Sequence, residues 1–195
     1  MSTPPRLFSY VVDHDHGHSP NPTGGLCTLA FCKYNTAGRR NVVELAQKGD
    51  WVIGTGGAST GSAGHGRLVY AMRVTEKLTL RDYFRDPRFT NRAGNDTDLT
   101  GRTDMFALVS DHFFYFGSAA PKFAKRHAEH PIEKRGPHFR SDFSDDFITD
   151  FVTWLEERHD PGIHGSPCEP VDDEWGGYEP SNLSRKCSSR PRDKC

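Results

Sequence analysis

The sequence predicts an α+β fold, a small mixed and partly closed β-barrel with helices at its flank. Residues 42–46 have the apolar spacing of a short amphipathic helix, and Gly49 and Asp50 break that pattern. An apolar strand at 51–53 follows and runs into a glycine-rich turn. Side chains in residues 67–74 show the two-residue alternation that is typical of a strand. Residues 144–158 carry a broad apolar face, which is typical of a helix docked on a core.

The remaining elements follow from local signals of the same kind. β-rich residues at 7–12 predict the first strand, and prolines and glycines make 13–25 a polar loop. Residues 26–33 fit either a second buried strand or the start of a helix. Thr79 has the position of an N-cap. Further expected elements are a short helix at 80–84 and strands at 106–109 and 113–116.

Length and composition limit the classes of protein. The 195 residues suit one domain, expected at 5–167, followed by a polar and disordered tail at 168–195. With 25 Lys and Arg against 26 Asp and Glu, net charge demands no polyanionic partner. No apolar run approaches the roughly 20 residues of a membrane span, and no secretory pattern is present. Five irregularly spaced cysteines indicate free thiols in a reducing compartment, so the expected location is cytoplasmic.

The sharpest local feature is the histidine run His14, His16 and His18, with Asp13 before it and Asp15 within it. Imidazole and carboxylate groups are common ligands of zinc and iron. However, the run lacks the helical HExxH spacing, so an exposed polar loop is the favoured interpretation and no metal ligand is assigned. Metal binding by this loop stays open as an alternative.

Several other residues are candidates for recognition. Asn21 lies between two prolines, which present its amide rigidly for contact with a base edge, although a plain turn is the commoner outcome. Cys27 and Cys32 lack the CxxC spacing and fit buried core positions better. The loop at 54–67 is rich in glycine and serine but has neither the Walker nor the dinucleotide spacing, so it is at most a lid or a weak phosphate cradle.

Eight blocks occur in an order that resembles a known family. They are SYVV (9–12), the D-x-G element (15–17), PNP (20–22), CTLAFCK (27–33), GDWVIGTG (49–56), GRLVYAMRVTEKLT (66–79), DPRF (86–89) and SDHFFYFG (110–117). Together they resemble the second type of nucleotide modification associated domain, a bacterial and phage family. The helix that leads through Gly49-Asp50 into a buried strand is also similar to the wall of PUA-like and ASCH-like barrels.

The resemblance implies a nucleic acid or nucleotide partner and a role in modifying bases, DNA included, or in recognising modified bases. Carried over position by position, it favours a pocket lined by Asp15, Asn21, Cys27, Cys32 and Lys33, with Thr55 and Arg67 at the opposite rim. Asp15 would be a general base and Asn21 a reader of the base edge. Lys33 or Arg67 would contact phosphate, and Cys32 is a candidate nucleophile.

Three functions remain in competition. The first is an accessory of nucleotide or nucleic-acid modification, either an enzyme or its specificity module. The second is a non-catalytic reader in which Trp51 or Tyr70 stacks an extruded base. The third is a metal-dependent hydrolase that uses the histidine loop. The residues imply no particular cofactor or oligomeric state.

Overall fold

A computed structural model describes residues 4–30, 33, 40–90, 92, 105–123, 131–134 and 138–169 of the chain. Over this part, the fold is a mixed α+β arrangement of two sheets and few helices, as the sequence predicts. No sheet among the described strands closes into a barrel. Cys32, most of 91–104 and the tail beyond Glu169 lie outside the described residues.

The larger sheet has six strands in the order β8-β1-β3-β4-β7-β9. β1 runs parallel to β3, and β9 runs parallel to β7, whereas the other neighbours are antiparallel. The strands are β1 (Leu7–Val12), β3 (Trp51–Gly56), β4 (Leu68–Arg73), β7 (His112–Tyr115), β8 (Phe139–Arg140) and β9 (Gly162–Ile163).

The smaller sheet is antiparallel and has the order β2 (Cys27–Leu29), β6 (Phe106–Ser110), β5 (Glu76–Thr79). It continues the larger sheet around a corner. Only Val74 and Thr75 separate β4 from β5, and only Asp111 separates β6 from β7. Thr75 donates its amide hydrogen to the carbonyl of Val109, so one long hairpin turns from the first sheet into the second.

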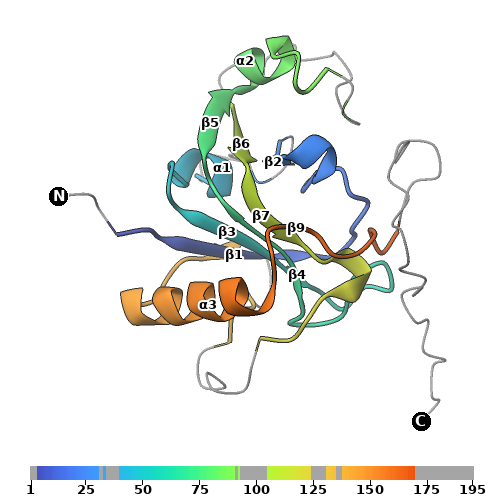
Figure 1. Ribbon diagram of the computed structural model, residues 1–195, viewed down its shortest axis with the longest axis vertical. Helices are drawn as coiled ribbons and strands as arrows, with labels where there is room; N and C mark the ends of the chain where they lie inside the picture. Colours follow the sequence, from blue (N-terminus) through green and yellow to red (C-terminus); the bar gives the residue numbers. More distant parts are fainter. Residues whose placement is uncertain are drawn as a thin grey trace.

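Three α-helices complete the described fold: α1 (Val42–Leu45), α2 (Leu80–Arg85) and α3 (Asp145–Arg158). Two short 3-10 helices are η1 (Thr23–Gly25) and η2 (Gly117–Ala119). The Ser144 hydroxyl accepts from the amide of Phe147 and caps α3, while Thr79 caps α2 in the same way through Asp82. In Figure 1, α3 lies along one side of the six-stranded sheet, and α1 with the smaller sheet lies on the other.

The two faces of the six-stranded sheet therefore belong to different cores. One core includes Trp51, Ile53 and Phe114 of the sheet with Phe151 and Leu155 of α3. We call this side the helix face. The opposite side packs Tyr10, Tyr70 and Tyr115 toward β2, β6 and α1, and we call it the tyrosine face.

The Gly49-Asp50 turn shows why the helix-to-strand signal was reliable. Gly49 has a φ of 97°, a conformation that favours glycine. The buried Asp50 carboxylate accepts hydrogen bonds from the amides of Arg6 and Gln47 and from the Arg6 guanidinium, at 2.7–2.9 Å. Asp50 therefore ties the start of β1 to the end of α1, and it sets the entry of the chain into β3.

Most predicted elements are present, with three additions. The strands predicted at 7–12, 51–53, 67–74, 106–109 and 113–116 correspond to β1, β3, β4, β6 and β7. Of the two alternatives for 26–33, the strand is right for Cys27–Leu29. The sequence reasoning missed β5, β8 and β9. β5 begins with the charged pair Glu76-Lys77, and β8 and β9 have two residues each, too few for periodicity to appear.

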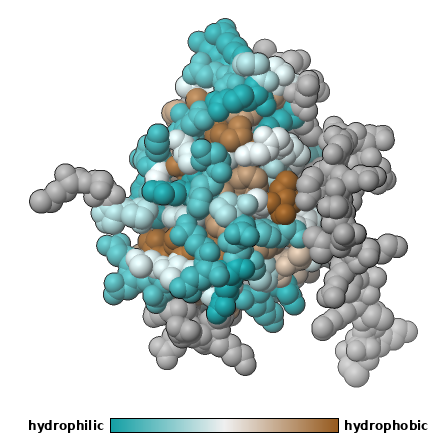
Figure 2. Space-filling model, in the orientation of Figure 1, coloured by the Kyte–Doolittle hydropathy of each residue, from teal (hydrophilic) through white to brown (hydrophobic). Residues whose placement is uncertain are grey.

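No helix in the described ranges is long and apolar enough to cross a membrane. The face of the molecule in Figure 2 is mostly hydrophilic, with small separate apolar patches. Scattered apolar patches are ordinary on protein surfaces and mark no site by themselves.

Candidate functional site: a buried tyrosine row and its loops

Three tyrosines and one glycine form a single row across the six-stranded sheet. Tyr10 pairs with Gly54, Gly54 with Tyr70, and Tyr70 with Tyr115. Directly opposed residues of neighbouring strands point to the same side, so the three rings share the tyrosine face. All three side chains are buried, and the hydroxyl groups of Tyr10 and Tyr70 lie 2.8 Å apart in a hydrogen bond.

The glycine in this row provides the space that the rings occupy. A Cβ atom at Gly54 would lie 2.5 Å from Cε1 of Tyr70 and 2.6 Å from a methyl group of Val12. Real Cβ atoms do not approach other atoms so closely, so any side chain here would displace the Tyr70 ring. Gly54 thus allows the Tyr70 ring to lie across β3 and to reach Tyr10.

Asp15 lies at the end of the row, on the loop that leaves β1. Its carboxyl group is buried and accepts a 2.7 Å hydrogen bond from the Tyr115 hydroxyl. The backbone amide of Cys168 lies 3.4 Å from the other carboxyl oxygen. Burial raises the pKa of Asp15 above its ordinary value, although the hydrogen bond from Tyr115 opposes the shift. Burial and the adjacent carboxyl group also raise the pKa of Tyr115.

Lys33 and Cys27 both lie beside the tyrosine face, Lys33 as a cation and Cys27 as a buried thiol. The Lys33 ammonium nitrogen lies 4.4 Å from the centre of the Tyr10 ring, within cation–π range. Cys27 is fully buried, and burial raises the pKa of its thiol to about 12. Cys27 is therefore a neutral core thiol at neutral pH, in agreement with the buried core position expected from its spacing.

Asn21 is buried and holds its own loop together. Its side-chain oxygen accepts from the amide and the hydroxyl of Thr23, at 3.1 and 2.7 Å. Arg92 donates to the backbone carbonyls of Asn21, Thr23 and Leu26 and to the Thr28 hydroxyl. These bonds join the loop after β1 to β2, and the Asn21 oxygen that would read a base is engaged within the loop.

The remaining candidates do not join the tyrosine row. The Thr55 hydroxyl donates to the carbonyl of Tyr10 at 3.3 Å, a bond between neighbouring strands. Arg67 is exposed, and its guanidinium donates to the carbonyl of Ala120. Trp51 lies on the helix face, stacked on Phe114, with only 3% of its surface exposed. Of the sequence-derived candidates that the structure describes, Asp15, Lys33, Tyr70 and the neutral thiol of Cys27 gather at the tyrosine face.

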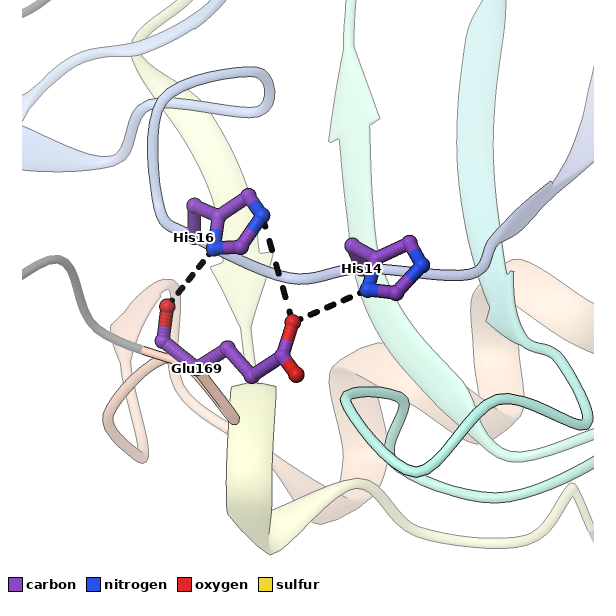
Figure 3. Close-up of side chains that lie close together, drawn as sticks. All are labelled: His14, His16 and Glu169. Carbon is purple, nitrogen blue, oxygen red and sulfur yellow. Dashed lines mark hydrogen bonds and ion pairs between the residues drawn. The ribbon is translucent and has the colours of Figure 1, made fainter.

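A second group lies on the outside of the same loop. His14 Nδ1 is 2.9 Å from Oε2 of Glu169, and His16 Nδ1 is 2.8 Å from the backbone carbonyl of Glu169. Figure 3 shows the two imidazole rings beside the Glu169 carboxylate. The rings are stacked, with centroids 6.0 Å apart. Each of these three residues offers one potential ligand atom, and the three atoms all lie within 4.8 Å of one another.

Sequence reasoning missed three residues that matter here. Tyr115 lies in the SDHFFYFG block, but only strand pairing places it next to Tyr70. Glu169 belongs to the segment expected to be a tail, yet its amide donates to the carbonyl of Asp15. Arg92 lies in a polar stretch without a recognisable motif. Each depends on contacts between residues more than 40 positions apart, which local patterns do not report.

Comparison with known proteins identifies the class of this α+β domain. A family model described as nucleotide modification associated domain 2 matches residues 4–103 and 91–174. Because these matches cover most of the chain, the protein belongs to that family, in agreement with the resemblance drawn from the sequence. No curated protein and no solved structure matches the chain.

Proposed function

We propose that this protein acts on or recognises a base, plain or modified, at the tyrosine face of the six-stranded sheet. Membership of the nucleotide modification associated domain 2 family supports a role connected with nucleotide modification. The proposed position of the base-binding site rests on the row of buried polar side chains. Tyr10, Tyr70, Tyr115 and Asp15 occupy a core face where apolar residues would pack without polar groups to satisfy.

The chemistry of this row suits a nucleobase. Aromatic rings stack on bases, and hydroxyl and carboxyl groups match the donors and acceptors of a base edge. Because Tyr10, Tyr70, Tyr115 and Asp15 are at most 1% exposed, a base reaches them only in a state in which the chain that covers them has moved. Lys33, held over the Tyr10 ring, supplies a cation for phosphate near the same place. In this proposal Asp15 contacts the base edge and is the candidate general base, while Arg67 is a peripheral phosphate contact. Asn21 supports its loop, and Trp51 supports the opposite core.

The proposal has a catalytic and a non-catalytic form. In the catalytic form the Asp15 carboxyl exchanges a proton with the base, and in the other form the row only binds the base. The buried position of Asp15 and its bond from Tyr115 are compatible with both. Turnover of the bound ligand separates them, since a reader returns the ligand unchanged.

We also propose that the two sheets are an open relative of the PUA-like barrel. The support is the long hairpin of β4-β5 and β6-β7, which belongs to both sheets and turns a corner between them. Strands that pass from one sheet to another are typical of barrels and orthogonal sandwiches. An experimental structure in which further strand pairing joins the free edges of the two sheets would support this kinship.

A binding titration tests the function. The full chain is titrated with single- and double-stranded oligonucleotides, plain and base-modified, and with free nucleotides, at two salt concentrations. We expect a preference for one base class that Tyr70→Phe and Lys33→Ala weaken. Lys48→Ala is the matched control, because Lys48 is an exposed lysine outside the row. Equal affinity of the Lys33 and Lys48 variants, or binding to none of the ligands, would contradict the proposal.

A further inference from the structure

We infer that His14, His16 and Glu169 form a binding site for one divalent transition-metal ion. The three residues come from the loop after β1 and from the segment after β9. Two imidazoles and one carboxylate are a ligand set that suits Zn²⁺ and Fe²⁺. The site lies outside the tyrosine row and does not depend on the proposed base-binding function.

The tautomer of His16 is the first argument. Its Nδ1 atom lies 2.8 Å from the Glu169 carbonyl oxygen, which can only accept, so Nδ1 carries the hydrogen. With the hydrogen on Nδ1, Nε2 is the ring nitrogen left for a metal ion. A metal-binding histidine is commonly oriented in this way, by donation from its other nitrogen to a backbone carbonyl.

The position of the Glu169 carboxylate is the second argument. Its Oε2 atom lies 2.9 Å from His14 Nδ1 and 3.9 Å from His16 Nε2. The 2.9 Å contact is a hydrogen bond, so a metal ion bound at His14 Nδ1 would replace the hydrogen shared there. Ligand atoms around a tetrahedral zinc ion are about 3.4 Å apart, given bonds of about 2.1 Å, and the 3.9 Å separation of Oε2 from His16 Nε2 is close to that value. A cation coordinated by both His16 Nε2 and the Glu169 carboxylate would fit in the 3.9 Å between these two atoms.

The surrounding chain holds the carboxylate in this position. The Glu169 amide donates to the carbonyl of Asp15 at 3.0 Å, which fixes the backbone beside the two histidines. A Cβ atom at Gly61 would collide with the Glu169 carboxyl group, so the absence of a side chain there leaves room for it. Inside the loop, Asp15 points to Tyr115, while its neighbours His14 and His16 point outward.

The site keeps room for further ligands. The side chains of His14, His16 and Glu169 are 57%, 42% and 39% exposed. Three protein ligands with open positions resemble catalytic rather than structural zinc sites, in which water or substrate completes the coordination. His18 lies beyond the set, with its ring centre 6.3 Å from that of His16.

The test uses the full chain purified without a histidine tag and stripped of metal with a chelator. Zn²⁺ is titrated by calorimetry, and Co²⁺ is titrated by absorption spectroscopy. We expect one equivalent to bind, with a Co²⁺ spectrum that lacks thiolate charge transfer. His14→Ala, His16→Ala and Glu169→Gln should each raise Kd by at least about 10-fold, since even outer partners of ligands cost about 10–100-fold.

Two further variants test whether the loss of metal binding is specific to this site. His65→Ala is the matched control, because His65 is an exposed histidine on another loop, and its Kd should equal that of the unchanged chain. Gly61→Ala retains all three ligands but displaces the carboxylate, so it should also weaken binding. Melting temperatures without metal verify that each variant is folded. Equal Kd values for the ligand variants and His65→Ala, or a thiolate band with Co²⁺, would overturn the assignment.

Discussion

The two faces of the six-stranded sheet are built from the same strands but bury very different side chains. The helix face packs Trp51, Phe114 and Phe151, and apart from the Trp51 indole N–H these three side chains carry no polar group. The tyrosine face buries hydroxyl, carboxyl and thiol groups, and the hydroxyl and carboxyl groups have hydrogen-bond partners. A buried polar group contributes less to stability than an apolar group of the same size. The helix face therefore mainly stabilises the fold, whereas the tyrosine face is the one at which we propose that a base binds.

The largest effect is expected on the helix face. Phe151 is fully buried between α3 and the sheet, so Phe151→Ala should reduce the free energy of unfolding by about 3–5 kcal/mol. Thr153→Ala, on the exposed side of the same helix, should change it by less than about 0.5 kcal/mol. Urea unfolding followed by circular dichroism measures both. Similar losses in the two variants would show that α3 is not docked by its apolar face.

The next effect is steric and belongs to the tyrosine face. Gly54→Ala places a methyl group against the Tyr70 ring and Val12, which should cost about 1–3 kcal/mol in unfolding free energy. A double-mutant cycle sharpens the test. In a Tyr70→Ala background the same glycine substitution should cost less, because the ring is gone. Strictly additive losses would mean that Gly54 does not make room for Tyr70.

Removing single hydroxyl groups compares the polar contacts within the row. Tyr115→Phe leaves the buried Asp15 carboxyl without its closest donor and should cost about 1–3 kcal/mol. Tyr70→Phe removes one partner of a neutral hydroxyl pair and should cost about 0.5–1.5 kcal/mol. Chemical denaturation of both variants under identical conditions shows which of them loses more unfolding free energy. The reverse order would argue against a buried Tyr115–Asp15 bond.

The last effect is absent at neutral pH and appears only at high pH. The pKa of the Cys27 thiol is about 12 in the folded chain, against an ordinary value of 9.0. The unfolded chain therefore loses this proton first, and the stability contribution present below pH 9 declines as pH rises toward 12. At pH 10 the loss is about 1.4 kcal/mol, because one pH unit corresponds to about 1.4 kcal/mol.

Cys27→Ala isolates this contribution. Removing the sulfur atom lowers the free energy of unfolding by an amount that does not depend on pH. Between pH 8 and pH 10, however, the variant should lose less stability than the unchanged chain. Denaturant unfolding of both proteins at the two pH values gives the change in unfolding free energy for each. The contributions of other titrating groups are the same in both proteins, so they drop out of the comparison. Parallel losses would indicate that the thiol ionises as easily in the folded chain as in the unfolded one.

The sequence by itself determined the local elements and the family. Apolar periodicity, the Ser144 and Thr79 caps and the Gly49-Asp50 break are short-range signals, and the helices and longer strands follow them. The ordered motif blocks were enough to indicate the nucleotide modification associated domain 2 family. Asp15, Lys33 and Tyr70 were also found this way, because they lie in those blocks.

Only the tertiary structure decided which residues meet. Strand register brought Tyr115 beside Tyr70, and the return of the chain after β9 brought Glu169 to His14 and His16. It also placed Trp51 on the helix face, away from the base-binding role first considered for it. Such contacts join residues 45 to 155 positions apart, and their energies depend on packing and burial around both partners. No pattern within a short window carries that information, because local propensity does not specify which distant strand a residue will face.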